Sequence, residues 1–449
     1  MPVVAQEAPE KAVSPASGAT NAEFLAAADE VLQQVSKITH LEIVTPFKKT
    51  LRSREEIRAY VLRQMREDKT EAERYAAERT AKAFGLIPKD FQMEPFLVDL
   101  LTEQVAGLYD PEGHEFYIAD WIPAGDQRMV MAHELTHALE DQHFQIEKWL
   151  KAARPNDDAE LAREAVLEGS ATAAMVDFLL KDTGHSVRDF PDVDPQALIG
   201  DLSSTPTLAK APQFVKDALL FPYLGGLRFT KDVLQHGGWN ALPGIFAKPP
   251  VSSQQILHPE LYREGRTPET IDLPVNEKTF RGTWKRLEDN ALGEFGWREV
   301  LQQFLGKERA VPLAAEWRGD RYAVFEEEST KKIILICRIR LSSAEAAARL
   351  FGQYSEALEK KHVERSKLFR RPNFFSFETP EDGGVFLRCV NQDCLVLEGG
   401  TRAHFDVVSK KMGWSPAPVP RKGMEKTPQR IAARRGFRQK VEVAASPAH

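Results

Sequence analysis

Residues 127–150, QRMVMAHELTHALEDQHFQIEKWL, constrain the fold most strongly, because they contain neither glycine nor proline and repeat apolar residues at helical spacing. Three of the eleven histidines of the chain lie here, at positions 133, 137 and 143. We expect one continuous helix that packs into a core and carries these histidines with it. A buried histidine pair needs partners for its ring nitrogens, and a metal ion is one such partner. The apolar residues that interleave with the histidines are Val130, Leu135, Ala138 and Leu139.

The first two of these histidines form the pattern H-E-x-x-H, with His133, Glu134 and His137. Residues four apart in a helix lie on one side, one turn apart, so the two imidazoles can share one cation. Zinc suits two neutral imidazoles and a carboxylate, with the fourth position left to water. Glu134 would then be a general base rather than a ligand, because it can take a proton from a water that the metal acidifies. The alternative is that the pattern is only the polar face of a helix.

A third ligand is expected on a second helix, AELAREAVLEGSATAAMVDFLLKD, at residues 159–182. Glu164 and Glu168 lie four apart on one face of this alanine-rich stretch. Two buried carboxylates repel each other, and one takes up a proton unless a cation compensates their charge. A divalent metal is such a cation; the alternative is that both glutamates face solvent. The small residues that would allow close approach of a neighbouring helix are Gly169, Ser170, Ala171, Ala173 and Ala174.

The elements around these two helices indicate an α+β chain. Residues 23–100 have helical patterns, and the charged stretch 53–88 begins with Ser53 and Glu56 at capping-box spacing. Residues 105–119, VAGLYDPEGHEFYIA, predict a β-hairpin that turns at residues 110–113. Helical patterns return after residue 126, and the stretch around FPYLGG continues in that style with breaks at proline and glycine.

A separate α+β domain is expected at residues 310–414. One long helix, at 343–362, separates the second of its strands from the third. A hairpin that turns at 391–393 would place Cys389 opposite Cys394, either as a disulfide or as two reduced thiols. The role of this domain is left open. The strand-like stretches lie at 321–329, 332–341, 374–380, 384–390 and 394–400.

Both ends of the chain have the composition of disordered segments, a leader at 1–22 and a basic tail at 415–449. VVAQEAP in the leader fits either the stub of a removed export signal or a cytoplasmic start, so the compartment is left open. The net charge of −6 gives no basic field that would indicate nucleic acid. No run of eighteen apolar residues occurs, so no membrane-spanning helix is expected.

Two of these stretches resemble a known clan of enzymes. HELTHALED is similar to the active helix of thermolysin-type peptidases, and LEGSATAAM is similar to the second helix of the gluzincin metallopeptidases. The resemblance implies that Glu168 is the third zinc ligand and Glu164 an acceptor behind it, with the reverse assignment as the alternative. It also implies a supporting role, or an alternative ligand role, for Asp141, which follows the second histidine by four residues.

The resemblance extends to the hairpin and covers about residues 100–180. AGLYDPEGHEFYIAD is similar to the edge hairpin before the active helix, where an extended substrate adds as a strand, which implies substrate contacts at Gly107 and Tyr109. The remainder departs from thermolysin and is closer to poorly characterised bacterial gluzincin-like families. Calcium sites and the thermolysin substrate pocket are therefore not carried over, and residues 23–305 are expected to form a gluzincin-like zinc metallopeptidase domain.

Hydrolysis also needs a donor to the developing oxyanion. His258 and Tyr262, in PPVSSQQILHPELY, and Tyr223, in LLFPYLGG, are the candidates. We favour His258 as the catalytic donor and place Tyr223 among the substrate-binding residues. A structural histidine that caps a loop is the alternative for His258.

Two functions follow from the sequence. The first is a zinc-dependent metallopeptidase that acts on peptides or proteins, with zinc on His133, His137 and Glu168 and with Glu134 as the base. The second is a non-catalytic metal-binding or scaffold protein that keeps a metallopeptidase-like core and acts through its C-terminal domain. Retention of Glu134 favours the enzyme, because a protein that only binds metal has no need of a base.

Overall fold

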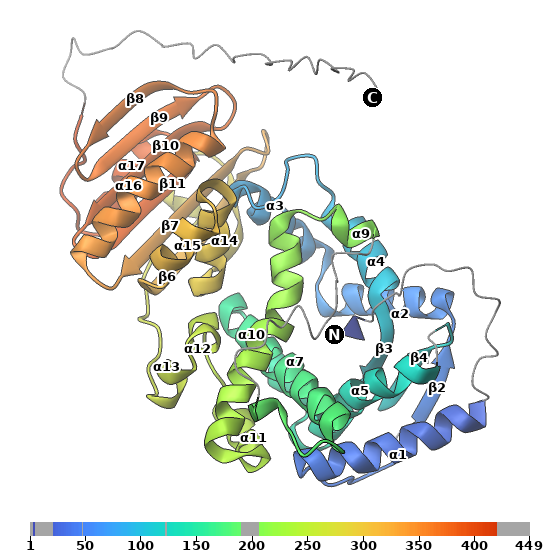
Figure 1. The fold of residues 1–449 in the computed structure, drawn as a ribbon. Helices are drawn as coiled ribbons and strands as arrows, with labels where there is room; N and C mark the ends of the chain where they lie inside the picture. The colour runs from blue at the N-terminus through green and yellow to red at the C-terminus, as the bar shows by residue number, and fades with distance from the viewer. Residues whose placement is uncertain (1–2, 5–20, 47, 122–123, 190–205, 420–449) are drawn as a thin grey trace, which may run out of the picture.

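The computed structural model describes residues 3–4, 21–46, 48–121, 124–189 and 206–419. The expected leader lies outside these residues except for 3–4 and 21–22, and the expected tail lies outside them from residue 420 on. The expected α+β class is confirmed, with a mainly helical N-terminal unit and a C-terminal antiparallel sheet (Figure 1). In the described part of the chain, no helix combines the length and the apolar character that crossing a bilayer requires.

The N-terminal unit begins with helices around a small sheet of order β1-β3-β4-β2. The expected capping box at Ser53 and Glu56 is present, but the charged stretch forms two helices rather than one. Thr70 interrupts it, because its side chain and that of Glu73 cap the second helix in the same way. The helices are α1 (Asn21–Thr39), α2 (Arg54–Asp68), α3 (Glu71–Phe84) and α4 (Met93–Gln104), and the strands are β1 (Val3–Val4), β2 (Lys48–Arg52), β3 (Val105–Asp110) and β4 (Glu115–Ala119).

The expected hairpin is formed by β3 and β4, which pair antiparallel on either side of the predicted turn. The expectation of one continuous helix over residues 127–150 was wrong, because α5 (Ala124–Phe144) ends before Gln145 and α6 (Ile146–Lys151) follows it. Gln145 has a left-handed backbone conformation, which ends α5 and redirects the chain. The second expected helix is α7 (Asp157–Leu180).

The core of the N-terminal unit lies where α1, α5, α7 and α10 (Gln213–Gly237) meet. α10 is continuous although Pro222 lies inside it. Short helices complete the unit; they are the 3-10 turn Val187–Asp189, α9 (Pro206–Ala209), the 3-10 turn Trp239–Ala241, α11 (Leu242–Ala247), α12 (Ser253–Leu257), α13 (Pro259–Arg263) and the 3-10 turn Glu277–Thr279.

The C-terminal domain is built on an antiparallel sheet of order β5-β6-β7-β11-β10-β9-β8. The sheet starts before the expected boundary at residue 310, because β5 pairs with β6. Its strands are β5 (Trp284–Asn290), β6 (Trp317–Glu327), β7 (Ile333–Leu341), β8 (Ser366–Arg371), β9 (Phe374–Thr379), β10 (Gly383–Val390) and β11 (Asp393–Gly400).

Helices cover both faces of this sheet. The expected long helix is α16 (Ala344–Lys361), which packs with one face of the sheet, while α17 (Arg402–Lys411) packs on the other. α14 (Gly293–Leu305) and α15 (Lys307–Ala314) lie between β5 and β6 in the chain. Cys389 and Cys394, directly opposite on β10 and β11, form a disulfide, which resolves the two alternatives left by the sequence.

Candidate metal centre

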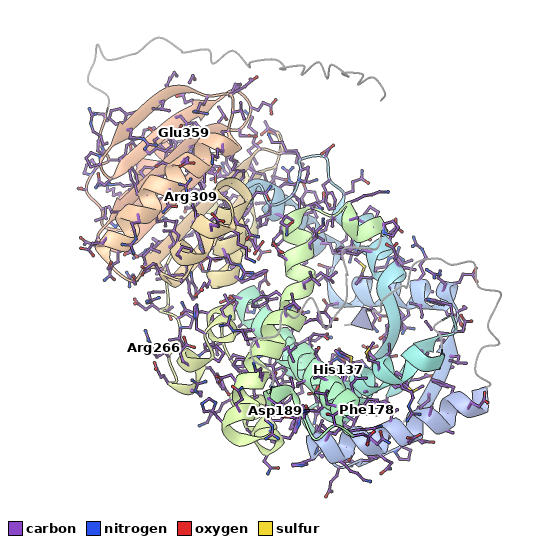
Figure 2. The ribbon with its side chains drawn as sticks, viewed as in Figure 1. His137, Phe178, Asp189, Arg266, Arg309 and Glu359 are labelled. Atoms are coloured by element: carbon purple, nitrogen blue, oxygen red, sulfur yellow. A yellow bond between two sulfur atoms is a disulfide. The ribbon has the colours of Figure 1, made fainter. Side chains whose placement is uncertain are left out.

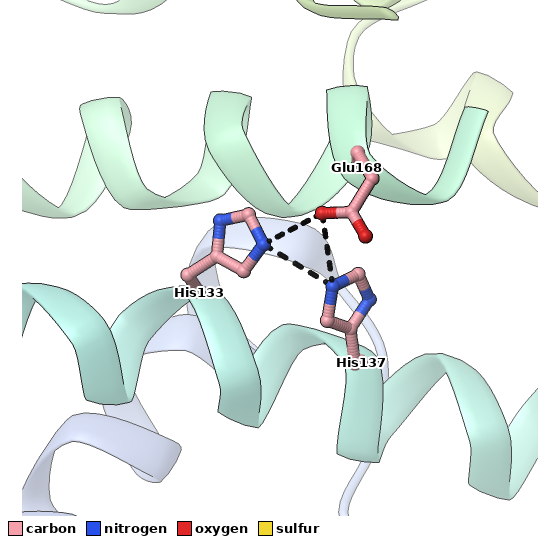
Figure 3. Close-up of side chains that lie close together, drawn as sticks. All are labelled: His133, His137 and Glu168. Carbon is pink, nitrogen blue, oxygen red and sulfur yellow. Dashed lines mark hydrogen bonds and ion pairs between the residues drawn. The ribbon is translucent and has the colours of Figure 1, made fainter. Parts of the chain in front are cut away.

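Three side chains from two packed helices form a buried group that could hold a metal ion (Figure 3). His133 and His137 lie one turn apart on α5, and Glu168 reaches them from α7. Their residues are 1%, 5% and 3% exposed, respectively, so water does not satisfy these polar atoms. The labelled His137 lies within the helical unit, away from Glu359 of the C-terminal domain (Figure 2).

The spacing of the three ligand atoms fits a single small ion. The two Nε2 atoms of His133 and His137 are 3.2 Å apart. Oε2 of Glu168 is 3.1 Å from Nε2 of His133 and 3.6 Å from Nε2 of His137. Ligands bonded to a tetrahedral zinc at about 2.1 Å are about 3.4 Å from one another. The three separations are therefore close to the edges of such a tetrahedron, whose fourth corner would be left for another ligand.

The charges in the group depend on one another. Burial alone would lower the pKa of the His137 imidazole, but hydrogen bonds to Glu140 and Glu168 outweigh it and raise the pKa to about 10. Burial alone would raise the pKa of Glu168, but hydrogen bonds with the two histidines hold it well below its ordinary value. A buried carboxylate thus lies against two imidazoles, where a divalent cation can take the place of protons.

Glu134 lies beside the group but faces the hairpin. Its Oε2 accepts a hydrogen bond from the backbone N–H of Tyr109 at 2.8 Å, so the carboxylate is fixed between α5 and β3. Burial raises the pKa of Glu134, and the charges of His133 and His137 oppose that shift. This carboxylate thus lies between the candidate metal ligands and the strand that the sequence predicts to bind substrate.

A supporting carboxylate is present one residue before the expected position. Oε2 of Glu140 is 3.3 Å from Nδ1 of His137, and Ser170 on α7 donates its hydroxyl hydrogen to Oε1 of Glu140. Such a contact fixes the orientation of a metal-binding imidazole and leaves Nε2 to face the ion. Sequence reasoning missed the contacts that Glu140 and Ser170 make in this group. The only signal for Glu140 was its position three residues after His137, on the same side of the helix.

Asp141, expected in that supporting role or as an alternative ligand, lies elsewhere. Its Oδ2 accepts a hydrogen bond from the Tyr109 hydroxyl at 2.9 Å and is 3.2 Å from Nδ1 of His114. Its Oδ1 accepts from the backbone N–H of Ile146 at the start of α6. Asp141 therefore attaches the hairpin to the end of α5 and, in these interactions, does not contact His133 or His137.

A third helix, α10, contributes Tyr223 to the group. Its hydroxyl hydrogen-bonds to Glu168, and its ring centroid is 6.1 Å from that of His133. Burial and the charges of Glu168 and Glu134 raise the pKa of Tyr223 well above its ordinary value, so the phenol keeps its proton. A protonated phenol at this position is a hydrogen-bond donor directed at the candidate metal centre.

The remaining expected residues are placed differently. Glu164 is half-buried, and burial and the charge of Glu160 raise its pKa to about 7, but Glu168 rather than Glu164 joins the histidines. His258 is bonded through Nε2 to Oε1 of Glu294 at 2.7 Å, between α12 and α14, instead of facing the metal-binding group. The alternative of a structural histidine fits His258, because this residue follows the end of α12 as its C-cap and Glu294 holds its ring.

Gly107 lies on β3 as expected, where the strand packs on α5. A Cβ at this position would lie 2.7 Å from Cγ1 of Val130. A side chain would therefore push the strand away from the helix that carries the histidines. Glycine at this position allows β3 to reach Glu134 through Tyr109.

Comparisons with known proteins bear on the other domain. Residues 280–409 match the model of a family described as a domain of unknown function, DUF8575. The match runs from before β5 into α17, in the C-terminal domain, and does not include the candidate metal centre. No curated protein and no solved structure matches the chain.

Proposed function

We propose that this protein is a zinc-dependent metallopeptidase of the gluzincin type. The observation that carries the proposal is the buried set of His133, His137 and Glu168 at tetrahedral spacing, with Glu134 beside it. Zinc is the ion favoured by two imidazoles and one carboxylate with an open fourth position. A protein that only stored metal would have no use for a buried carboxylate between the ligands and a strand.

In this proposal, different residues of the chain carry out different steps of peptide hydrolysis. Zinc, when bound, would polarise the peptide carbonyl and make water more acidic. Glu134 takes the proton of the attacking water as the new C–O bond forms, and it gives that proton to the nitrogen as the C–N bond breaks. β3 aligns the peptide backbone, and the Tyr223 hydroxyl donates to the carbonyl oxygen as its negative charge develops.

Metal content and turnover measured together test the proposal. The full chain is loaded with zinc, and bound metal and hydrolysis of unfolded, fluorescently labelled casein are measured for the parent and for Glu134→Gln. We expect bound zinc to be unchanged and turnover to fall by about 10²–10⁴-fold, the usual contribution of a general base. Glu147→Gln, which changes a partly exposed carboxylate on α6, is the matched control and should leave both quantities unchanged. Equal turnover of the parent and Glu134→Gln would refute the proposal.

The second function is a metal-binding protein without turnover that acts through its C-terminal domain. It is favoured by the family match, which covers that domain alone. It predicts one bound zinc per chain and no hydrolysis by the parent. Glu168→Ala would abolish zinc binding under both proposals, so the turnover of the parent distinguishes them.

A further inference from the structure

The outer edge of β3 carries a strand from the chain's own N-terminal segment. β1 pairs antiparallel with β3, with Val3 opposite Gly107 and Val4 opposite Val105. β4 occupies the other side of β3. β1 also lies against α5, the helix of the metal-binding histidines. Without β1, β3 would be an edge strand whose outward N–H and C=O groups are open to pairing with another chain.

The edge of β3 where β1 pairs lies on the same side of the strand as Glu134. In an extended strand, the N–H groups of residues two apart point to the same side. The N–H of Tyr109 points to Glu134 rather than to β4. The N–H of Gly107 therefore points to the same side as that of Tyr109, which is the side where β1 pairs. β1 thus pairs at Gly107, two residues before Tyr109, whose backbone N–H bonds the proposed base Glu134.

We infer that β1 is an intramolecular competitor that occupies the strand-binding edge where an extended peptide substrate would pair. The inference rests on the proposed function, because it takes this edge as the substrate site. A strand of two residues makes few backbone hydrogen bonds, so a longer extended peptide can displace it. Its tether nevertheless gives it a high effective concentration at the edge, so it weakens the apparent affinity for every competing strand.

Proline substitution in the full chain tests this competition without removing a part of the fold. In Val3→Pro/Val4→Pro, both backbone N–H donors are lost, so β1 cannot pair normally with β3. Val3→Thr/Val4→Thr is the matched control, since threonine keeps the donors and the β-branched side chain. Hydrogen exchange of the β3 amides, measured in a Glu134→Gln background so that nothing is cleaved, reports occupancy of the edge independently of turnover.

We expect faster exchange at β3 in the proline variant than in the parent or the threonine control. A synthetic peptide with the sequence of residues 1–12, MPVVAQEAPEKA, should restore protection when it is added to the proline variant. With Glu134 intact, the proline variant should have a lower KM for unfolded casein and an unchanged kcat. The decrease is about tenfold if the tethered strand occupies the edge about nine-tenths of the time.

Each other result has a separate meaning. Equal exchange at β3 in the parent and the proline variant would overturn the inference, and so would faster exchange with an unchanged KM. If the zinc-loaded parent hydrolyses nothing, the proposed peptidase function fails. The competition is then decided by exchange alone: unfolded casein should protect β3 more strongly in the proline variant than in the parent, and equal protection would overturn it.

Discussion

Gly169 on α7 lies directly against Gly226 on α10. A Cβ at Gly169 would lie 2.2 Å from the carbonyl carbon and oxygen of Gly226, a distance that no side chain can occupy. Glu168 precedes Gly169, and Tyr223 lies one turn before Gly226, so the same helix contact brings this carboxylate and this phenol together. The close approach at Gly169 thus brings α10, and with it Tyr223, to the candidate metal centre.

Gly226→Ala should separate α7 from α10. The new Cβ would lie 2.0 Å from the carbonyl oxygen of Ala165, so the backbone must move, which typically costs about 1–3 kcal/mol in a packed core. Tyr223 would move away from Glu168 with α10, and kcat should fall more than zinc affinity. Gly352→Ala in α16 is the control, because no atom lies within 4 Å of its Cβ position and alanine favours a helix. A variant as stable and as active as the parent would contradict this account of the helix contact.

The adjacent residues Glu140 and Asp141 should have separable effects. Glu140→Ala removes the partner of the His137 Nδ1, and loss of such a partner typically weakens metal binding about 10- to 100-fold. Asp141→Ala removes the acceptor of the Tyr109 hydroxyl and of the Ile146 N–H, so it should lower the free energy of unfolding and leave zinc affinity unchanged. Competition with a zinc chelator and urea unfolding measure the two effects. Weaker zinc binding in Asp141→Ala alone would reverse the assignment.

Helical spacing accounts for what the sequence could predict of the site. His133 and His137 are four apart in a helix without glycine or proline, so their common direction follows from local structure alone. Glu140 could not be predicted, because its orientation depends on Ser170, which another helix supplies. Spacing in the sequence did not distinguish His258 from Tyr223 as the oxyanion donor. The proline and glycine near position 223 were expected to break the helix. α10 runs through them, and Gly226 serves helix packing instead.

Hydrophobic alternation likewise accounts for what could be predicted of the C-terminal sheet. The central strands β7, β10 and β11 are rich in buried apolar residues and were predicted close to their observed bounds. β5 and β8 are the two edge strands of the sheet and are mostly exposed or half-buried, so their charged sequences lack the pattern of a strand. The domain boundary was therefore expected too late in the chain.

Tyr223→Phe should separate catalysis from metal binding. The change removes only the hydroxyl that lies at Glu168, and loss of one donor to an oxyanion typically costs about 10²–10³-fold in kcat. Zinc content should not change, because the three ligands remain. Tyr262→Phe is the matched control, since its hydroxyl donates to the carbonyl oxygen of Lys248, away from the ligands. His258→Ala should likewise leave kcat unchanged, and a large loss there would restore His258 as the oxyanion donor.

Glu299 on α14 should make stability depend on pH. Burial, and next the charge of Asp217, raise the pKa of its carboxyl from 4.5 to about 8. Below pH 4.5 the folded and unfolded chains both hold this proton, so the carboxyl does not make the free energy of unfolding depend on pH. Between pH 4.5 and about 8 only the folded chain holds it, and the free energy of unfolding falls by up to about 1.4 kcal/mol per pH unit. Above about pH 8 the folded and unfolded chains have both released the proton, so the free energy of unfolding no longer falls because of this group.

Glu299→Gln removes this titration while its amide can still donate a hydrogen bond to Asp217. The variant should therefore gain stability over the parent as the pH rises from about 5 to about 8, because only the parent loses stability from this group. Urea unfolding across this range measures the difference, with the exposed Glu308→Gln as the control for removal of one carboxylate on a neighbouring helix. A difference between Glu299→Gln and the parent that does not change with pH would show that Glu299 is ionised in the folded protein.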